Sequence, residues 1–350
     1  MKRILVIRFS AMGDVAMALP VLKLVLKDNP NLEITFLTGK NVADLFGNIE
    51  RLIPIGIDFK KQYKGIVGLK KLHRALLKNE KFDAVIDLHN VLRSNILGVF
   101  FRLSAIPIFK INKERDIKRK MIQTKQLYQL PHTTERYLRV FNQAGIKTNN
   151  ADFNFPSVIV SEEDKNITAL FLNNFLKPFI AFAPFAKHAT KSFPLSKSEE
   201  LIQALSKNYT VFLLGGKENA EQFDKWESSF PNTHSTGQLN LIQQVALMSH
   251  VKAVISMDSA NMHLAAIQGV PIVSIWGATH PFFGFSGIGT NSSSWISAEA
   301  SPACRPCSVF GNKPCKNKQE PYACMNRIKV APIIKAIHEI SEKSQSTTPQ

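Results

Sequence analysis

An acidic residue just after the first apolar run is the clearest candidate for acid–base chemistry. Asp14 follows the run Lys2–Phe9 and closes the turn-forming segment Ser10–Asp14. In an open α/β sheet, ligands bind at the carboxyl ends of strands, where loops and helix N-termini converge. A carboxylate placed there can accept a proton from a hydroxyl group. Aspartate is also favoured in the first turn of a helix, where it complements the helix dipole. A catalytic role and a capping role therefore both stay open for Asp14.

Two lysines in a later loop have the chemistry to bind an anionic group such as a phosphate. Lys187 and Lys191 belong to residues 187–194 (KHATKSFP), which follow a strand-like run. The ammonium group of lysine meets a phosphate as a point charge. Most lysines, however, are simply solvated at the protein surface. Either lysine could therefore contact a ligand or remain in water.

A junction between a strand pattern and a helical pattern offers a second anion-binding feature, at residues 256–263 (SMDSANMH). Asp258 and Ser259 suit the cap of that helix, whose free N–H groups would point at an incoming anion. His263 fits either a donor to that anion or a satisfied core histidine. The sequence has neither a G-x-G-x-x-G fingerprint nor a P-loop here, which argues against dinucleotide and nucleoside-triphosphate sites.

All of the chain's cysteines lie close together near its end, with the spacing C-x2-C-x7-C-x8-C. A cluster of this kind in a cytosolic chain indicates a tetrahedral zinc site first and disulfides second. Because the gap between the second and third cysteines is shorter than in usual zinc ribbons, a structural clamp on a long loop is favoured over catalysis. The residues are Cys304, Cys307, Cys315 and Cys324.

Two basic runs and a net charge of +17 indicate an anionic partner, such as nucleic acid, a phosphorylated substrate or an acidic membrane surface. The first run has no acidic residue between Phe59 and Asn79 and is interleaved with few aromatic residues. That scarcity weakens the case for single-stranded nucleic acid. Each run could also be a solvated helix face. The cations are Lys60, Lys61, Lys64, Lys70, Lys71, Arg74 and Lys78 in the first run and Lys110, Lys113, Arg115, Lys118, Arg119, Lys120 and Lys125 in the second, both assigned to the first domain.

These candidates need a scaffold that brings strand ends together, and the alternation of strand and helix patterns predicts one. Such alternation is typical of a parallel sheet covered on both faces, and it restarts at residue 179 after a divide near residues 152–177. We expect two doubly wound, Rossmann-like α/β domains facing a central cleft. The expected strands are 2–9, 34–37, 84–88, 179–183, 210–214, 253–256 and 271–276, and the expected helices include 15–27, 196–208 and 261–268. The expected divisions are 1–160, 161–340 with a cysteine-rich loop at 301–326, and a frayed polar tail at 341–350.

The sequence also bears on the relation of the chain to a membrane. No uninterrupted apolar run reaches the roughly 18 residues that a spanning helix needs. Arg8 and Asp14 follow the first apolar run too soon for the core of a signal peptide. We therefore expect a cytosolic protein.

Several motifs, spread over most of the chain, resemble those of the ADP-heptose:lipopolysaccharide heptosyltransferases of glycosyltransferase family 9. The most specific is the stretch 258–266, and the cysteine-bearing tail that ends at Cys324-Met325 is similar to a tail in many members. The motifs are 7–14 (IRFSAMGD) with 18–20 (ALP), 85–89 (VIDLH) with 92–94 (LRS), 132–137 (HTTERY), 191–194 (KSFP), 258–266 (DSANMHLAA), 269–271 (GVP) and 276–281 (WGATHP).

The resemblance implies a GT-B architecture whose second domain holds most of a sugar nucleotide, with ADP-heptose as the expected donor. It also implies an inverting transfer that requires no metal or other cofactor. The implied acceptor is a phosphorylated lipopolysaccharide core glycolipid, met by peripheral contact with the cytoplasmic face of the inner membrane. Nucleic acid then becomes an unlikely partner.

Carried over residue by residue, the resemblance makes Asp14 the general base that deprotonates the acceptor hydroxyl. Lys191 becomes a ligand of the donor diphosphate, and Glu218, after Gly216, a candidate for the ribose hydroxyls. The remaining diphosphate candidates are Asp258, Ser259, Ala260, Asn261, Met262 and His263. The candidate acceptor-binding cations are Lys60, Lys61, Lys64, Arg93, Arg119 and Lys120.

Two departures from the family pattern keep alternatives open. The family usually has Gly-Pro where this chain has Ala260-Asn261, and Asp where it has His280. A different donor sugar, or a catalytically inactive relative that binds a nucleotide sugar and acts as a regulator, is compatible with these changes.

Overall fold

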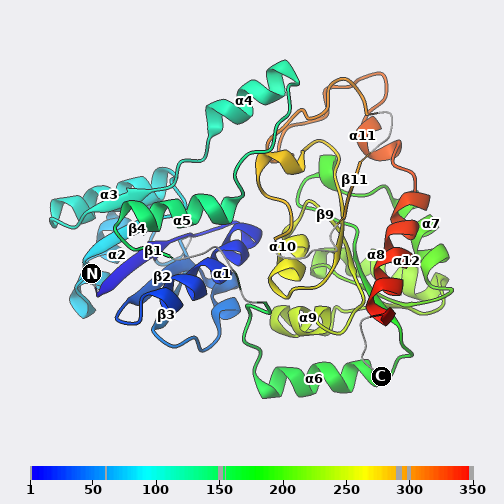
Figure 1. Ribbon diagram of the computed structural model, residues 1–350, viewed down its shortest axis with the longest axis horizontal. Coiled ribbons are helices and arrows are strands. Elements are labelled where there is room, and N and C mark those ends of the chain that lie inside the picture. The colour runs from blue at the N-terminus through cyan, green and yellow to red at the C-terminus, as the bar shows by residue number, and fades with distance from the viewer. Residues whose placement is uncertain are drawn as a thin grey trace. The chain divides into compact units, whose positions relative to one another are not determined.

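The computed structural model describes residues 2–59, 61–148, 153, 155–288, 294–297 and 301–346, with the side chains of 79 and 344–346 left out of the description. It divides into two compact units. Unit 1 comprises residues 1–114 and 131–159, and unit 2 comprises residues 115–130 and 160–350. Each contains its own parallel sheet (Figure 1). Among the described residues, no helix is both long and apolar enough to cross a bilayer.

Unit 1 is built on a five-stranded parallel sheet with the strand order β3-β2-β1-β4-β5. Its central strand is a continuous apolar run, with Ile4, Leu5, Val6 and Ile7 fully buried, as expected for a strand covered on both faces. The strands are β1 (Arg3–Ile7), β2 (Glu33–Gly39), β3 (Leu52–Ile57), β4 (Ala84–Asp87) and β5 (Ile108–Lys110).

The helices of unit 1 pack in two pairs, α1 with α5 and α2 with α3. Apolar spacing alone predicts that helix α1 begins at Val15. In the structure it begins at Met12, so Asp14 lies within its first turn. The helices are α1 (Met12–Asp28), the short 3-10 helix η1 (Lys40–Phe46), α2 (Gly65–Asn79), α3 (Leu92–Leu103) and α5 (Thr133–Gln143).

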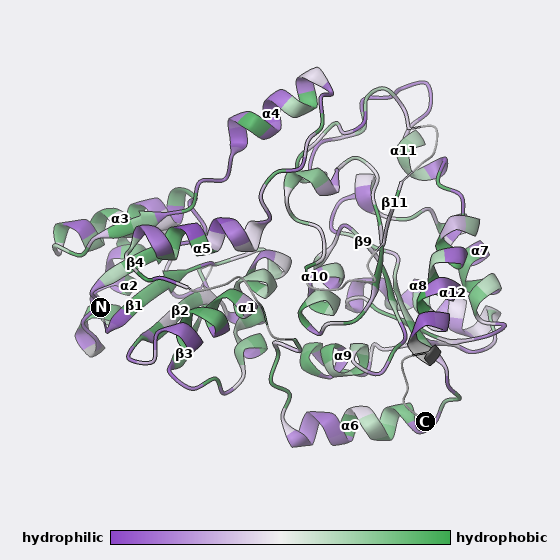
Figure 2. Ribbon diagram, viewed as in Figure 1, coloured by the Kyte–Doolittle hydropathy of each residue, from purple (hydrophilic) through white to green (hydrophobic). Residues whose placement is uncertain are grey.

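Unit 2 repeats the plan with a six-stranded sheet in the order β11-β10-β9-β6-β7-β8, parallel at each described pairing. Figure 2 shows that apolar residues concentrate in the strands and on the helix faces that pack against them. The strands are β6 (Phe179–Ala183), β7 (Thr210–Leu213), β8 (Thr233–Ser235), β9 (Val254–Met257), β10 (Ile272–Ile275) and β11 (Ser294–Ile296). The helices are α4 (Arg115–Thr124), α6 (Glu162–Leu172), α7 (Leu195–Leu205), α8 (Ala220–Ser229), α9 (Leu241–Met248), α10 (Ala260–Ile267), α11 (Ala323–Asn326) and α12 (Ala331–Ser346), with short 3-10 helices η2 (Ala189–Lys191), η3 (Lys217–Asn219) and η4 (Pro281–Phe283).

The structure divides the second basic run, which the sequence assigned to the first domain: Lys110 and Lys113 lie in unit 1, and the run from Arg115 onward lies in unit 2. Helix α4, with Arg119 and Lys120, belongs to unit 2. Polar and cation–π contacts explain this grouping. The ammonium group of Lys118 lies 5.5 Å from the ring centre of Phe285, and the backbone N–H of Leu130 donates to the carbonyl of Phe282 at 2.9 Å.

The predicted frayed tail at 341–350 is also corrected in part, because helix α12 continues to Ser346. Ser341 is buried, and its hydroxyl accepts a hydrogen bond from the Tyr209 hydroxyl at 3.2 Å. Ile333, Ile337 and Ile340 pack into the core of unit 2. The polar composition of residues 341–350 hid this continuation of the helix, and 347–350 lie outside the described residues.

Candidate functional site

In each unit some of the candidate residues follow the strands at which the strand order reverses. The sheet of unit 1 reverses between β1 and β4, and the sheet of unit 2 reverses between β6 and β9. In doubly wound sheets this switch point opens a crevice at the carboxyl ends of the two strands, where ligands bind. Asp14 follows β1 and His89 follows β4, whereas Lys191 follows β6 and Asp258 follows β9.

The carboxylate of Asp14 is held by neighbouring groups and remains partly exposed. Its Oδ2 forms an ion pair with the guanidinium of Arg8 and accepts the backbone N–H of Ala11 at 3.4 Å. The Asp14 side chain is 36% exposed, against 6% for Arg8. Asp14 thus belongs to the helix start, as a capping role requires, and its carboxylate is partly exposed.

Buried neighbours fix the charges around Asp14. Burial alone would lower the pKa of Arg8, but the charge of Asp14 and further contacts raise it above its usual range, and Nη1 of Arg8 donates to the carbonyl of Leu88 at 2.7 Å. Burial, followed by the positive charge of Arg8, lowers the pKa of His89 to about 3. His89 is therefore neutral, and its Nδ1 accepts the backbone N–H of Phe9 at 3.3 Å.

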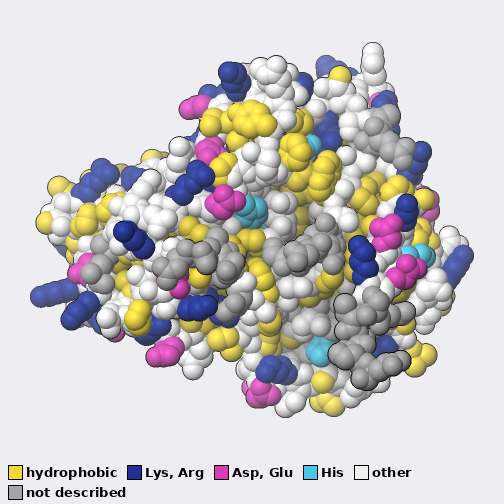
Figure 3. Space-filling model, in the orientation of Figure 1, with side chains coloured by type: hydrophobic (Ala, Val, Ile, Leu, Met, Phe, Trp, Pro, Cys, Tyr) yellow, Lys and Arg dark blue, Asp and Glu magenta, His cyan; other side chains and the backbone are white. Residues whose placement is uncertain are grey.

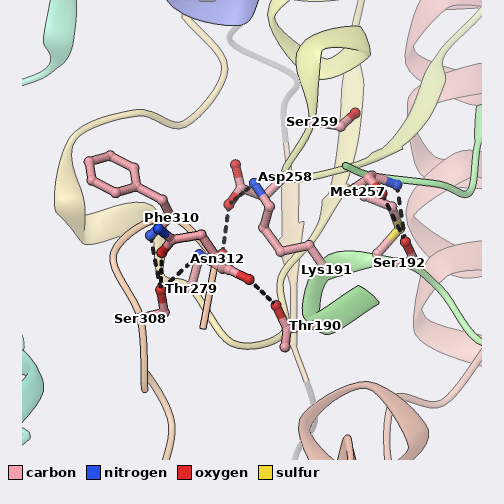
Figure 4. A network of polar contacts seen from close by, with 12 residues as sticks. Thr190, Lys191, Ser192, Met257, Asp258, Ser259, Thr279, Ser308, Phe310 and Asn312 are labelled. Atoms are coloured by element: carbon pink, nitrogen blue, oxygen red, sulfur yellow. Dashed lines mark hydrogen bonds and ion pairs between the residues drawn. The ribbon is translucent and has the colours of Figure 1, made fainter. Parts of the chain in front are cut away.

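The counterpart in unit 2 is a lysine–aspartate–threonine group (Figure 4). The ammonium group of Lys191 lies 3.4 Å from Oδ2 of Asp258, and both side chains are largely buried. The hydroxyl of Thr279, in the loop after β10, donates to the same carboxylate oxygen at 2.7 Å. Asp258 therefore orients Lys191 rather than offering a free negative charge to a ligand.

The N-terminus of α10 lies directly after Asp258 and adds backbone donors to this group. Ser259 is the N-cap residue but makes no side-chain capping bond; its hydroxyl instead lies 3.1 Å from that of Ser256. The N–H groups of the first turn have no partner within an α-helix, and the helix dipole favours an anion there. Ala260 and Asn261 are half-buried at this end.

The remaining predicted nucleotide residues of unit 2 fall into two groups. The side chains of Met262 and His263 are buried within α10. By contrast, Gly216 and Glu218 are exposed at the carboxyl end of β7. A Cβ atom on Gly216 would lie within 2.6 Å of both carboxylate oxygens of Glu218. The carboxylate of Glu218 therefore lies against Gly216, just after the end of β7.

The side chain of His280, at a position where the resemblance implies Asp, is buried and has a structural role. Its Nδ1 accepts the backbone N–H of Phe282 at 3.2 Å and so caps the short helix η4. Burial, with a smaller contribution from Arg305, lowers its pKa to about 4. A neutral imidazole therefore stands where a carboxylate is usual.

The four cysteines share one pocket and are not joined as disulfides. Thr190 and Ala278 line the same pocket. Burial, then the nearby thiols of Cys307 and Cys304, raises the pKa of Cys324 to about 11. Within the described part of the chain, no three His, Cys, Asp or Glu side chains already stand in the arrangement of a metal site.

The predicted acceptor-binding cations are divided between the units. Lys61 and Lys64 are exposed in unit 1, where the guanidinium of Arg93 lies 5.5 Å from the ring centre of Phe59. Figure 3 shows Lys and Arg side chains over α2 and α3. In unit 2, Arg119 pairs with Asp116 at 3.3 Å at the surface, and Lys120 is exposed. Lys60 lies outside the described residues.

Sequence reasoning did not single out Arg8 and Thr279 as parts of the site. Arg8 could have been predicted from its place in the sequence, because a cation at the end of a buried strand lies near the switch point of the sheet. Thr279 lies 21 positions from Asp258, and its role follows from the return of β10 beside β9, which local patterns do not reveal.

Comparison with known sequences places the chain in a family. Residues 69–312, more than half of the chain, match the sequence model of glycosyltransferase family 9 (heptosyltransferase). The lipopolysaccharide core heptosyltransferase OpsX of Haemophilus influenzae is 25% identical over 286 residues, covering 80% of each chain. Lipopolysaccharide heptosyltransferase 1 of Escherichia coli is 24% identical over 303 residues, covering 80% of this chain and 89% of the relative.

Solved structures agree on the fold. A family 9 glycosyl transferase from Veillonella parvula aligns with a TM-score of 0.77 at 21% identity, covering 97% of both chains. The heptosyltransferase WaaC of Escherichia coli, solved with ADP, aligns with a TM-score of 0.66 at 18% identity over 97% of this chain and 98% of that one. The chain therefore belongs to glycosyltransferase family 9 and is a glycosyltransferase with the GT-B fold.

Proposed function

We propose that this enzyme transfers a heptose, or a closely similar sugar, from ADP-heptose to a hydroxyl of a phosphorylated lipopolysaccharide core acceptor, with inversion at the anomeric carbon. The curated relatives carry lipopolysaccharide heptosyltransferase names, and WaaC was solved with ADP. The main support for the proposal is that the two switch points present groups of opposite charge. Unit 1 presents the accessible carboxylate of Asp14, and unit 2 presents the ammonium group of Lys191 beside the start of α10.

Asp14 acts as the general base in this proposal. Its carboxylate takes the proton of the acceptor hydroxyl while that oxygen forms a bond to the anomeric carbon. The bond between the anomeric carbon and the diphosphate oxygen breaks, and ADP leaves with the electron pair. Base catalysis of this kind typically contributes about 10²- to 10⁴-fold in rate. Arg8 orients the carboxylate through the ion pair.

The charge that develops on the leaving diphosphate is met by Lys191 and by the backbone N–H groups that open α10. Fixed donors aimed at a developing charge need no reorganisation during the reaction, and removal of one such donor costs roughly 10²- to 10³-fold in turnover in other enzymes. These groups supply the positive charge that a metal would otherwise provide, so we propose a transfer that requires no metal. Glu218 binds the ribose hydroxyls near Gly216.

The acceptor is proposed to be an anionic glycolipid, reached by peripheral contact at the cytoplasmic face of the inner membrane. Exposed Lys61 and Lys64, together with Arg93, provide cations in unit 1, and the chain carries a net charge of +17. Basic residues near an anionic leaflet contribute about 1 kcal/mol each to membrane association.

The four cysteines are proposed to hold a structural zinc ion. Four thiol ligands are the donor set of a closed structural zinc site, and all four line one pocket. Burial, and after it the neighbouring thiols, raises the pKa of Cys307 and Cys324. Zinc would draw the sulfur atoms together within the pocket that they share.

The test is an assay of sugar transfer with a matched pair of lysine variants. The purified protein, incubated with ADP-heptose and a lipopolysaccharide core precursor, should form a heptosylated product, and a panel of other sugar nucleotides checks the donor sugar. Lys191→Met should reduce turnover by about 10²-fold, whereas Lys187→Met, four residues away and exposed, should retain it. Absence of both transfer and nucleotide binding across the panel would refute the proposal, and nucleotide binding without transfer would favour the inactive regulator.

A further inference from the structure

An exposed aromatic ring lies next to the lysine that we propose as a ligand of the diphosphate. Phe310 is 56% exposed. The residue after it, Gly311, contacts the side chain of Lys191, because a Cβ atom on Gly311 would approach Cγ of Lys191 to 2.6 Å and Cδ to 2.7 Å. Gly311 also has a φ of +71°, in the left-handed region that favours glycine. The backbone that carries the Phe310 ring therefore lies against the aliphatic part of Lys191.

Hydrogen bonds hold this backbone in place. The buried hydroxyl of Thr190 donates to the carbonyl of Gly311 at 2.6 Å. The hydroxyl of Ser308 accepts the backbone N–H groups of Phe310 at 3.3 Å and of Gly311 at 2.9 Å. Figure 4 shows Thr190, Ser308 and Phe310 beside Lys191. The position of the ring is thus tied to the loop that carries Lys191.

A second aromatic residue orients the ring of Phe310. Phe285, which is buried in the connection between β10 and β11, stacks with Phe310 at a distance of 6.3 Å between ring centres and an angle of 21° between ring planes. The ammonium group of Lys118 lies 5.5 Å from the ring centre of Phe285. This stack orients the Phe310 ring and leaves more than half of the residue open to a ligand.

The order of the strands predicts where each part of a sugar nucleotide would lie on unit 2. Glu218, the proposed ribose ligand, follows β7, and Lys191, the proposed diphosphate ligand, follows β6. Beyond β6 the sheet continues with β9 and then β10. The diphosphate of a sugar nucleotide joins the ribose on one side to the sugar on the other. The sugar is therefore expected beyond Lys191, on the side of β10.

Phe310 lies on this side of Lys191, because its segment is attached to the loop that follows β10. Nε of Arg305 donates to the carbonyl of Gly277 at 2.8 Å. The backbone N–H of Cys307 donates to the carbonyl of Ala278 at 3.0 Å. The segment thus runs along the β10 loop before it reaches Lys191, which places the Phe310 ring on the sugar side of the diphosphate ligand and not on the ribose side.

We infer that the ring of Phe310 stacks on the sugar of the donor and is a specificity-determining residue for that sugar. The face of an aromatic ring is electron-rich, and the carbon-bound hydrogens on one face of a pyranose carry a small positive charge, so the two surfaces attract each other and exclude water. This inference rests on the proposed function, because Lys191 and Glu218 are the proposed ligands of the diphosphate and the ribose. Phe310 makes no contact with the ADP part of the donor.

The experiment compares the binding of ADP with the binding of ADP-heptose, measured by calorimetry on the full-length protein without acceptor. Phe310→Ala should weaken ADP-heptose binding roughly 10- to 30-fold, because both the stacking contact and the burial of the ring are lost. Its ADP affinity should stay within about twofold of the parent. In the transfer assay the KM for the donor should rise by a similar factor, with the acceptor KM unchanged.

Two further variants test whether the ring itself is responsible. Phe310→Tyr keeps an aromatic face and should keep the parental affinity for ADP-heptose. Isolated exposed apolar side chains are common on protein surfaces, so Leu176→Ala serves as the matched control. Leu176 is exposed in unit 2, but it precedes β6 and so lies at the opposite end of the sheet from Lys191. Its replacement should leave both affinities unchanged, and thermal unfolding checks that all variants are folded.

The outcomes separate this inference from the proposed function. Parental affinity for ADP-heptose in Phe310→Ala overturns the inference while the proposed function stands. An equal loss of affinity for ADP and for ADP-heptose also overturns it, because the ring would then act on the ADP part or on the Lys191 loop. So does a loss in Phe310→Tyr as large as that in Phe310→Ala. A folded parent protein that binds neither ADP nor ADP-heptose refutes the proposed function.

Discussion

At the scale of single residues, the two carboxylates of the candidate site have opposite surroundings. Asp14 is 36% exposed and pairs with a buried arginine, which leaves its carboxylate accessible for the proton transfer that we propose. Asp258 is 7% exposed and receives both Lys191 and Thr279 on one oxygen. These surroundings, rather than residue type, are the reason that we propose Asp14 as the base and Asp258 as the residue that orients Lys191.

Replacement of the proposed base isolates the proton-transfer step. Asp14→Asn keeps the size of the side chain but removes the proton acceptor, so turnover should fall by about 10²- to 10⁴-fold. ADP affinity, measured by calorimetry, should remain within about twofold, because the diphosphate contacts are proposed to lie in unit 2.

Asp28 provides the control for this substitution, as an acidic residue at the other end of the same helix. Asp28→Asn should retain full turnover. A comparable loss in both variants, or a large loss of ADP affinity in Asp14→Asn, would show that Asp14 maintains structure instead of taking the proton.

The buried histidine at the switch point of unit 1 makes stability depend on pH. The pKa of His89 is about 3 in the folded chain, against about 6.5 when unfolded. Between these values the unfolded state binds more protons, so the free energy of unfolding falls as pH falls below about 6.5. At pH 5 the loss should be about 2 kcal/mol relative to pH 7.

Urea unfolding of His89→Gln at both pH values checks this dependence, since glutamine can still accept the Phe9 N–H. The variant should lose less stability on acidification than the parent. His338→Gln, which replaces an exposed histidine of α12, should keep the parent's pH dependence. Identical acid sensitivity of parent and His89→Gln would contradict the assignment.

The sequence was sufficient to predict the residues that follow strand ends, namely Asp14, Lys191 and Asp258. Asp258 stands directly after β9, and Asp14 and Lys191 lie in the segments that follow β1 and β6; position after a strand can be read from local sequence. Gly311 could not be identified as a Lys191 contact, because the two residues meet only after 120 positions of intervening chain have folded. Its glycine identity is explained by the side chain that crosses it.

At the scale of elements, the buried parallel strands were the most predictable part. The predicted strand 179–183 coincides with β6, and 271–276 brackets β10 (Ile272–Ile275) by one residue at each end. Continuous apolar runs mark such strands because both faces are covered. Helix ends were less predictable, since α12 continues into a segment rich in Ser, Glu and Lys while burying one apolar stripe.

The apolar stripe of α12 should contribute measurably to the stability of unit 2. Ile337 is fully buried, so Ile337→Ala should lower the free energy of unfolding by about 2–5 kcal/mol through lost burial and a residual cavity. Ile334, on the same helix, is only partly buried, and Ile334→Ala should cost clearly less. Chemical denaturation of both variants measures the difference, and equal losses would mean that α12 is not docked as described.

At the scale of the whole molecule, the excess of 44 Lys and Arg over 27 Asp and Glu is a surface property. From this excess of positive charge, the sequence predicts an anionic partner. It could not predict how the cations are shared between units, because Lys118 and Lys125 join unit 2 through contacts with Phe285 and the carbonyls of Cys304 and Pro306.

Association with anionic vesicles should therefore depend on salt and on where charge is changed. Binding to phosphatidylglycerol vesicles, measured by sedimentation, should weaken strongly between 0.1 M and 1 M salt, because the screening length falls from about 10 Å to about 3 Å. The double variant Lys61→Glu, Lys64→Glu should bind less than the double variant Lys207→Glu, Lys335→Glu, which makes the same charge change on unit 2. Equal binding by the two variants would argue against unit 1 as the membrane-facing part.

The path of the chain has a consequence for anyone who recombines members of this family. Residues 115–130 leave unit 1, join unit 2, and return the chain to unit 1 at residue 131. A chimera spliced once near residue 160 would inherit helix α4 from one parent and its packing partner Phe285 from the other. Exchange of unit 2 between relatives therefore requires three crossover points, with 115–130 transplanted alongside 160–350.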